Sequence, residues 1–130
     1  MNDNAAIETV TTYLRLVEER RLTEASAYLS PGVEISFPLG RSFASLDEQV
    51  AAAATMYRSI GKVFDGFDVL DRDESTVVYV YGTLEGEDLA GDRFGGVRFI
   101  DRFEIVDGLI TTHRVWNDLA GALGRQEQGG

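Results

Sequence analysis

The chain has 130 residues, no cysteine and a net charge of −10 at neutral pH, and 44% of its residues are hydrophobic. This length fits one domain, and the lack of cysteine excludes disulfides and thiolate chemistry. Such an acidic chain repels phosphate backbones and anionic lipids, which argues against nucleic-acid and membrane partners. No apolar run approaches the ~20 residues of a membrane-spanning helix. Because the first residues do not resemble a signal peptide, we expect a cytoplasmic protein.

The first part of the chain predicts two helices. Apolar side chains at helical spacing predict a helix over residues 4–20, with Asn4 as its cap and Tyr13 on or beside the buried face. A short second helix is predicted to begin after Thr23. It is expected to end at the turn formed by residues 30–32, Ser-Pro-Gly.

A short strand and a third helix follow. Apolar and polar residues alternate over residues 33–37, which predicts a half-buried strand. The third helix is predicted to begin after Ser45, whose spacing to Glu48 forms a capping box. Its apolar periodicity extends to Ile60, and Gly61 is a suitable C-terminal stop.

From Lys62 onward the pattern predicts strands only, at Val63–Asp71, Thr76–Glu85, Arg93–Val106 and Leu109–Asp118. Asp107-Gly108 indicates a tight hairpin, and Gly95-Gly96 indicates a bulge within a long strand. Helices early and an antiparallel sheet late predict an α+β fold with helices on one sheet face. We expect a single domain over residues 1–123 and a flexible tail over residues 124–130.

Asp101 is an unexpected charge on an apolar strand face. Along residues 97–105 the odd positions are Val, Phe, Asp, Phe and Ile, so alternation places this carboxyl among apolar side chains. A buried acid in such a place has a raised pKa or a specific partner, and is a candidate functional group. Two structural alternatives remain, an ion pair with Arg102 or Arg114, or a register shift at the bulge that places Asp101 in water.

His113 is the only histidine of the chain and the natural proton carrier near neutral pH. A hairpin at Asp107-Gly108 with one extra residue would place His113 opposite Phe103, on the same face as Asp101. An unbulged two-residue turn would place it opposite Arg102 on the outer face. The sequence leaves both registers open.

The chain resembles the nuclear transport factor 2-like superfamily, which includes ketosteroid isomerases and SnoaL-like polyketide cyclases. The resemblance runs from about Ala5 to Asp118 and is carried by the order of the elements and by three segments: Tyr13-Leu14-Arg15-Leu16-Val17, Phe37-Pro38-Leu39-Gly40 and Val106–Ile110 with Trp116-Asn117-Asp118. It implies a cone in which three N-terminal helices pack on a curved, mainly antiparallel sheet. Such cones hold a small apolar ligand and commonly dimerise through their sheets.

The resemblance also implies site residues. Tyr13 and Asp101 fall on the two oxyanion-binding positions of ketosteroid isomerases, where the acid is held protonated by its apolar surroundings. The catalytic base of those enzymes falls on Phe37, which cannot accept a proton. His113 is therefore the candidate to move the proton. The arginine and aspartate positions of limonene epoxide hydrolases are not matched, which disfavours that activity. The predicted pocket residues are Phe37, Tyr57, Phe67, Phe99, Phe103, Val115 and Asn117.

Three functional hypotheses follow. The first is an isomerase, cyclase or dehydratase that acts on an apolar cyclic or polyketide-like substrate through Tyr13, Asp101 and His113, with no organic cofactor. The second is a binding protein for a small apolar metabolite, and the third is a structural homodimer that uses the outer sheet face around Ile100 and Trp116. No His-x-His or His-Glu-x-x-His motif is present, and we expect no metal site.

Overall fold

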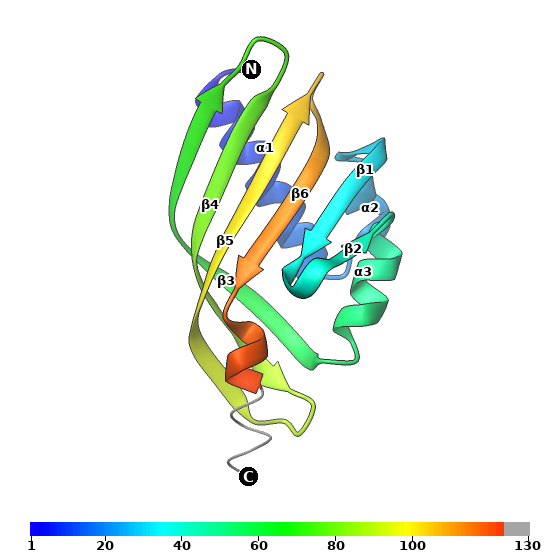
Figure 1. Ribbon diagram of the computed structural model, residues 1–130, viewed down its shortest axis with the longest axis vertical. Coiled ribbons are helices and arrows are strands. Elements are labelled where there is room, and N and C mark those ends of the chain that lie inside the picture. The colour runs from blue at the N-terminus through cyan, green and yellow to red at the C-terminus, as the bar shows by residue number, and fades with distance from the viewer. Residues whose placement is uncertain (124–130) are drawn as a thin grey trace.

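The computed structural model describes residues 1–123 as a curved sheet of six strands with helices on its inner face (Figure 1). The helices are α1 (Asp3–Glu18), α2 (Leu22–Ser26) and α3 (Leu46–Ala53), with a 3₁₀ turn η1 (Pro38–Gly40). The strands are β1 (Leu29–Phe37), β2 (Arg41–Phe43), β3 (Tyr57–Asp71), β4 (Thr76–Asp88), β5 (Arg93–Val106) and β6 (Leu109–Asn117). The predicted tail over residues 124–130 lies outside the described residues.

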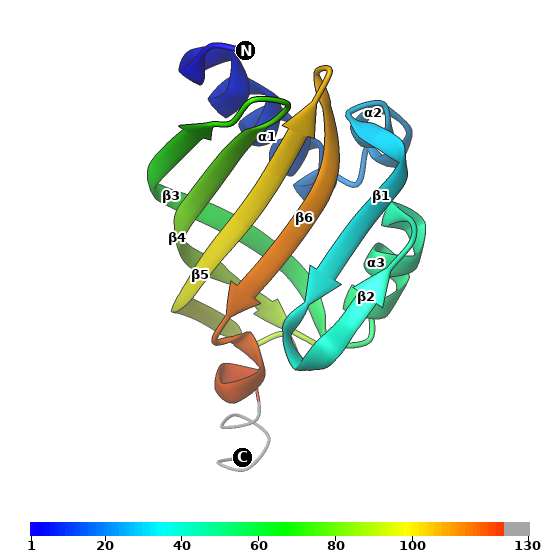
Figure 2. The same cartoon turned by 45° about the horizontal axis from the view of Figure 1, so that its top comes forward.

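The strand order is β2-β1-β6-β5-β4-β3, and every neighbouring pair is antiparallel except β1 and β6, which are parallel. Figure 2 shows α1 crossing behind the sheet while β3 curls around beneath it. The predicted α+β cone of helices on a curved, mainly antiparallel sheet is confirmed. Within residues 1–123, no helix combines the length and the apolar character that crossing a bilayer requires.

The curl of the sheet depends on glycines in β4. A Cβ atom added to Gly82 would lie 1.9 Å from the carbonyl oxygen of Val63, and one added to Gly86 would lie 2.0 Å from that of Ser59. Since no larger residue fits against these carbonyls, the close approach of β3 to β4 requires glycine at both positions. The predicted bulge at Gly95-Gly96 is present, because the β4–β5 register shifts between Leu84 and Gly86.

The largest difference from the sequence prediction concerns the third helix. Helix α3 begins as predicted, with the Ser45 hydroxyl accepting a hydrogen bond from the Glu48 N–H at 3.2 Å, but it ends at Ala53. Residues 57–60, predicted to be helical, instead begin β3 and pair with residues 86–88 of β4. The spacing of their apolar side chains fits both a helix and a strand. These residues form a strand because their backbone groups pair with those of β4.

Two smaller boundaries also differ. Helix α1 is capped by Asn2 rather than by Asn4, because the Asn2 side chain accepts a hydrogen bond from the Ala5 N–H at 2.7 Å. The Ser-Pro-Gly segment at residues 30–32 lies inside β1 rather than in a turn. There the β1–β6 register is irregular between Leu29 and Glu34, and such an irregularity accommodates a proline in a strand.

Candidate functional site

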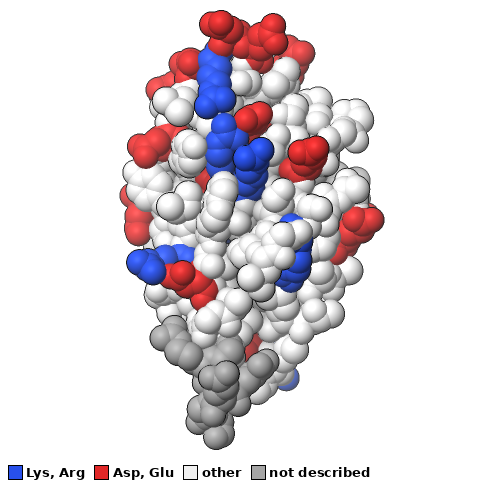
Figure 3. All heavy atoms as spheres, viewed as in Figure 1, with Lys and Arg blue, Asp and Glu red and all other residues white. Residues whose placement is uncertain are grey.

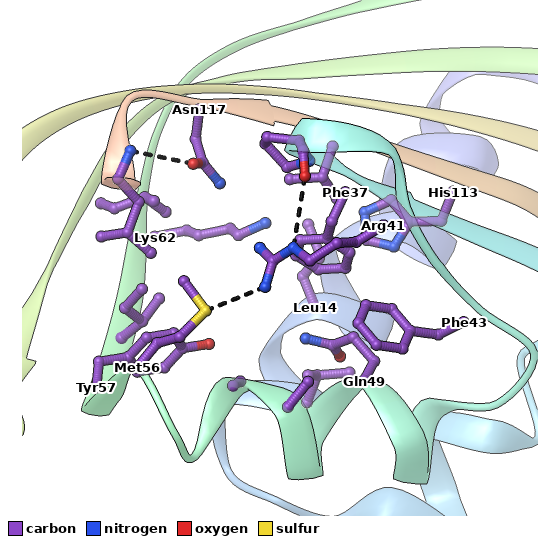
Figure 4. Close-up of a pocket in the computed structure, with 18 of the residues that line it drawn as sticks. Leu14, Phe37, Arg41, Phe43, Gln49, Met56, Tyr57, Lys62, His113 and Asn117 are labelled. Carbon is purple, nitrogen blue, oxygen red and sulfur yellow. Dashed lines mark hydrogen bonds between the residues drawn. The ribbon is translucent and has the colours of Figure 1, made fainter. Parts of the chain in front are cut away.

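A pocket opens between the inner sheet face, α1, α3 and the β1–β2 hairpin (Figure 4). Most of its wall is apolar and comprises Leu14, Val17, Phe37, Pro38, Leu39, Phe43, Ala52, Ala53, Met56, Ile60, Leu84, Val115, Leu119 and Ala120. The remaining lining residues carry polar groups and are Tyr13, Glu18, Arg20, Arg41, Gln49, Tyr57, Lys62, His113 and Asn117. A mainly apolar pocket with a few convergent polar groups is the usual form of a small-molecule site.

Three ionisable side chains meet at the wall of this pocket. The side chain of Asp101 is fully buried, and its Oδ2 forms an ion pair with the ammonium group of Lys62. His113 Nε2 lies 3.2 Å from the same oxygen, in a contact that does not meet the geometry of a regular hydrogen bond. Lys62 and His113 line the pocket, whereas Asp101 lies behind them. Asp101 is therefore a shared partner of two pocket side chains rather than a pocket residue.

The strand register explains how two members of this cluster come together. Asp101 on β5 pairs with Val115 on β6, and Phe103 pairs with His113, so Asp101 and His113 are diagonal neighbours on the inner face. The β5–β6 register shifts by one residue between Glu104 and Ile105. The hairpin thus contains the extra residue that turns His113 inward, and this is the first of the two registers left open by the sequence.

Asp101 is an ionised carboxylate. Burial alone would raise its pKa, but the charge of Lys62 and the contact with His113 outweigh burial and lower the pKa below the usual value. The prediction of a protonated Asp101 that donates a hydrogen bond to an oxyanion is therefore wrong. The physical reason is Lys62, which supplies an opposite charge that the sequence interpretation did not place beside Asp101.

His113 is neutral at neutral pH. Burial lowers its pKa, and the charge of Lys62 acts in the same direction, whereas the carboxylate of Asp101 only partly offsets them. Its ring stacks on Phe103, with centroids 4.1 Å apart. With Nε2 facing the carboxylate of Asp101, the neutral tautomer that carries its proton on Nε2 leaves a lone pair on Nδ1. This atom is buried and has no hydrogen-bond partner among residues 1–123.

Tyr13 is the third predicted catalytic residue, and its ring lies edge-on to that of His113 with centroids 6.0 Å apart. The side chain is 1% exposed and lines the pocket. Burial, together with the charge of Asp101, raises the pKa of its phenol. Tyr13 therefore stays protonated at any physiological pH and can act only as a hydrogen-bond donor or a neutral acceptor.

Four of the seven predicted pocket residues line the pocket, namely Phe37, Tyr57, Val115 and Asn117. The other three lie outside the lining, which corrects the prediction. Phe67 packs on Phe64 with ring centroids 5.5 Å apart. Phe99 lies beneath Lys62, whose Nζ is 4.7 Å from its ring centroid, and Phe103 lies against His113. These side chains share the inner face of the sheet, but other residues cover them.

Lys62 is the member of the site that the sequence interpretation missed. With β3 beginning at Tyr57, strand alternation places Ile60, Lys62 and Phe64 on one face, and all three are partly buried. A lysine between two apolar residues of a strand face is the same signal that identified Asp101. The misplaced end of the third helix concealed it.

Among residues 1–123, no three acidic or histidine side chains gather as a set of metal ligands. The polar groups of the pocket are cations, amides, phenols, one imidazole and the single carboxylate of Glu18. Such a set is suited to proton transfer and to the binding of an anionic or carbonyl oxygen.

The lowered pKa of His113 predicts a specific dependence of stability on pH. Since unfolded histidine titrates near 6.5 and the folded group titrates lower, the contribution of His113 to stability is complete above pH 6.5 and is lost as the pH falls below it. We expect a loss of up to about 1 kcal/mol in the free energy of unfolding between pH 6.5 and 5.5. Urea unfolding at both pH values measures it. Because His113 is the only histidine, His113→Phe should abolish most of this dependence, and an unchanged dependence would contradict the assignment.

The sequence matches no protein-family model and no curated protein. The fold, in contrast, matches solved structures over nearly its whole length. An NTF2-like protein of unknown function from Burkholderia pseudomallei aligns with a TM-score of 0.76 at 20% identity, over 95% of this chain and 97% of that protein. TerC, co-crystallised with polyporic acid, aligns with a TM-score of 0.75 at 18% identity, over 95% of this chain and 98% of TerC.

A putative SnoaL-like polyketide cyclase from Jannaschia sp. CCS1 aligns with a TM-score of 0.63 at 19% identity, over 92% of this chain and 90% of the cyclase. Identities this low establish the common fold rather than a common activity. The helices, the strand order and the end-to-end coverage agree with the resemblance seen in the sequence. The protein therefore has the nuclear transport factor 2-like fold, which it shares with SnoaL-like polyketide cyclases.

Proposed function

We propose that this protein is an acid–base enzyme that acts on a small apolar cyclic or polyketide-like ketone. The observation that carries the proposal is the contact of Lys62, Asp101 and His113 at the wall of a mainly apolar pocket. Clusters of perturbed ionisable groups in a pocket are characteristic of catalytic sites. The shared fold of polyketide cyclases and the co-crystallisation of TerC with polyporic acid support a ligand of this class.

The proposed reaction begins with neutral His113. Both ring nitrogens of His113 are buried in the structure, so the reaction requires a small turn of the ring that brings Nδ1 to the bound ligand. Nδ1 then accepts a proton from the carbon next to the substrate carbonyl, so a C–H bond breaks, an N–H bond forms and the electron pair moves to the carbonyl oxygen. The ammonium group of Lys62 and the phenol of Tyr13 donate hydrogen bonds to the resulting enolate oxygen. Asp101 remains ionised behind them and stabilises the imidazolium that forms on His113.

The enolate can then follow one of three routes. Return of the proton from His113 to a different carbon gives an isomer. Attack of the enolate carbon on a second carbonyl of the same molecule closes a ring, and His113 returns its proton to the alkoxide that forms. Alternatively, the enolate expels a β-hydroxyl group, which leaves as water with the proton from His113 and gives a dehydrated product. All three routes share the first proton transfer, so that step can be tested without knowledge of the product.

The test is hydrogen–deuterium exchange at carbon. Cyclic ketones such as 2-tetralone are first screened for binding by the shift in melting temperature. Each ligand that binds is then incubated with the protein in D₂O, and the loss of the proton signal next to the carbonyl is followed by NMR. We expect exchange faster than in buffer alone for at least one ligand. Ketones that bind but exchange no faster than in buffer would contradict the enzymatic proposal.

The second candidate function is that of a binding protein without catalysis. Its support is Phe37, which stands where the resemblance to ketosteroid isomerases implies the catalytic base. Phe37 packs edge-on against Phe43 with centroids 5.7 Å apart, and both rings line the pocket. This wall provides apolar contact area and no proton acceptor, and binding without exchange would favour this function.

We further propose that the outer sheet face forms a homodimer. Ile100 and Trp116 pair directly between β5 and β6 and are 46% and 50% exposed. In Figure 3, uncharged and basic side chains occupy much of the middle of the sheet face, and most acidic ones lie toward its edges. An exposed apolar patch of this kind, rimmed by polar residues, is typical of an interface.

Trp116→Glu is expected to convert the dimer to a monomer, because the substitution places a carboxylate where two apolar faces would meet. Light scattering after size exclusion measures the mass. Leu89→Glu is the matched control, since Leu89 is 51% exposed but lies beyond the end of β4. A wild-type protein that is monomeric at micromolar concentration would refute the dimer.

A further inference from the structure

Two arginines at the pocket have no acidic partner in the part of the chain that the structure describes. Arg20 and Arg41 line the pocket, and no ion pair joins either of them to a carboxylate within the described part of the chain. Within residues 1–123, the side chain of Arg41 donates to the Pro38 carbonyl, at 3.4 Å, and to the thioether of Met56, at 3.3 Å. These are neutral acceptors, so the charge and most donors of the guanidinium remain uncompensated.

The surroundings strengthen this positive character. Among residues 1–123, the only carboxylate in the pocket lining is that of Glu18, which already accepts hydrogen bonds from Arg15 Nη1 at 2.9 Å and from the Lys62 backbone N–H at 2.7 Å. Lys62 is neutralised by Asp101. The arginines therefore leave a net positive charge at the pocket, in a chain that carries −10 overall. A local field of opposite sign to the rest of the protein attracts anions to that place.

The position of Arg41 directs this charge into the pocket. In Figure 4, Arg41 extends inward from the β1–β2 hairpin and Lys62 extends inward from the opposite wall, with Tyr57 below. Burial raises the pKa of the Tyr57 phenol, and the nearby charges of Arg20 and Arg41 oppose that rise. The phenol thus remains protonated beside two guanidinium groups, where it is a third donor for an acceptor oxygen.

We propose that the ligand of this pocket carries a carboxylate that binds to Arg41 and Arg20, while its apolar ring system extends toward Lys62 and His113. The inference rests on the proposed function of the pocket and defines its substrate class as apolar cyclic keto acids. The planar guanidinium group can donate two parallel hydrogen bonds to the two oxygens of a carboxylate. A halide or an uncharged carbonyl cannot accept this pair of bonds, so the site favours a carboxylate over both. Arg41 is then a specificity-determining residue rather than a catalytic one.

The test compares two probes of one shape, 2-naphthoate and 2-naphthamide, by titration calorimetry with the full chain. The wild-type protein is expected to bind naphthoate at least about tenfold more tightly than naphthamide, because a hydrogen bond to a charged group is stronger than one to a neutral amide. Arg41→Gln should reduce naphthoate affinity by about the same factor and leave naphthamide affinity unchanged. Arg20→Gln with Arg41→Gln should abolish the preference.

Arg72→Gln is the matched control, because Arg72 follows β3 in an exposed turn and its replacement changes the net charge equally. Equal affinity of the wild type for both probes, no binding of either, or an equal loss in Arg72→Gln would overturn the carboxylate site. Equal affinity together with carbon exchange on a cyclic ketone would leave the proposed acid–base function intact. Arginine-dependent naphthoate binding without exchange on any ketone would instead retain the carboxylate site in a binding protein.

Discussion

Replacement of Lys62 by methionine is expected to lower the free energy of unfolding by about 3–5 kcal/mol at pH 7, the usual cost of breaking a buried ion pair from one side. Asp101 is fully buried and Lys62 is 14% exposed, so water cannot replace the lost ammonium. Methionine retains the length and apolar stem of lysine, which limits the change to the charge. Urea unfolding of the purified variant measures the loss.

The pH dependence of this variant separates a buried charge from lost packing. Without Lys62 the pKa of Asp101 rises above its unfolded value, so the stability of Lys62→Met should increase as the pH falls from 7 toward 4. In the wild type the pKa of Asp101 is lowered, so the pH dependence of stability has the opposite sign. The stabilisation by the ion pair is lost as the pH falls below about 4.

A double variant provides the control. Lys62→Met combined with Asp101→Asn removes both charges, and we expect it to be more stable than Lys62→Met alone at pH 7. The difference between the double variant and the sum of the single ones gives the coupling free energy. A loss below 1 kcal/mol in Lys62→Met, with no coupling, would show that the pair behaves as an exposed one.

The second large effect concerns catalysis. His113→Phe is expected to slow carbon–hydrogen exchange on a bound ketone by 10²–10⁴-fold, the usual contribution of a positioned general base. Phenylalanine preserves the stacking on Phe103 and the apolar contacts of the ring. Ligand affinity should therefore remain within a few-fold of the wild-type value. NMR exchange rates at saturating ligand measure the effect.

Gln49→Leu is the comparison for this substitution, because Gln49 lines the same pocket and belongs to neither the cluster nor the arginine pair. Its exchange rate should change only a few-fold. The wild-type rate should rise with pH and reach half its maximum below pH 6.5, as the lowered pKa of His113 requires. Full exchange activity in His113→Phe would exclude His113 as the base and leave the binding function as the better account.

The correction at Asp101 changes the chemistry expected of this pocket. A protonated Asp101 would have donated a hydrogen bond to the oxyanion directly. In the ion pair Asp101 is the negative counter-charge, so in the proposed reaction Lys62 and Tyr13 donate the hydrogen bonds to the oxyanion. The carboxylate thus acts on two side chains. It offsets the charge of Lys62, and it also favours protonation of His113. Proton transfer to His113 is easier near this carboxylate than in the apolar pocket alone.

The sequence alone determined most of the elements and the inward face of β5. Alternation along β5 placed Asp101 between buried Phe99 and Phe103, and the late run of strands after three helices predicted an α+β fold with helices on one sheet face. These are local properties, since a side chain's face follows from the period of its own strand. The same reasoning failed at residues 57–60, where the apolar spacing suited a helix and a strand alike.

Only the tertiary structure decided which groups meet. Lys62 on β3 reaches Asp101 on β5 across the intervening β4, and this contact depends on the curl of β3 against Gly82. The inward position of His113 depends on one extra residue in the β5–β6 pairing. Both are relations between segments far apart in the chain, which hydrogen-bond register and sheet curvature fix and which no single segment encodes.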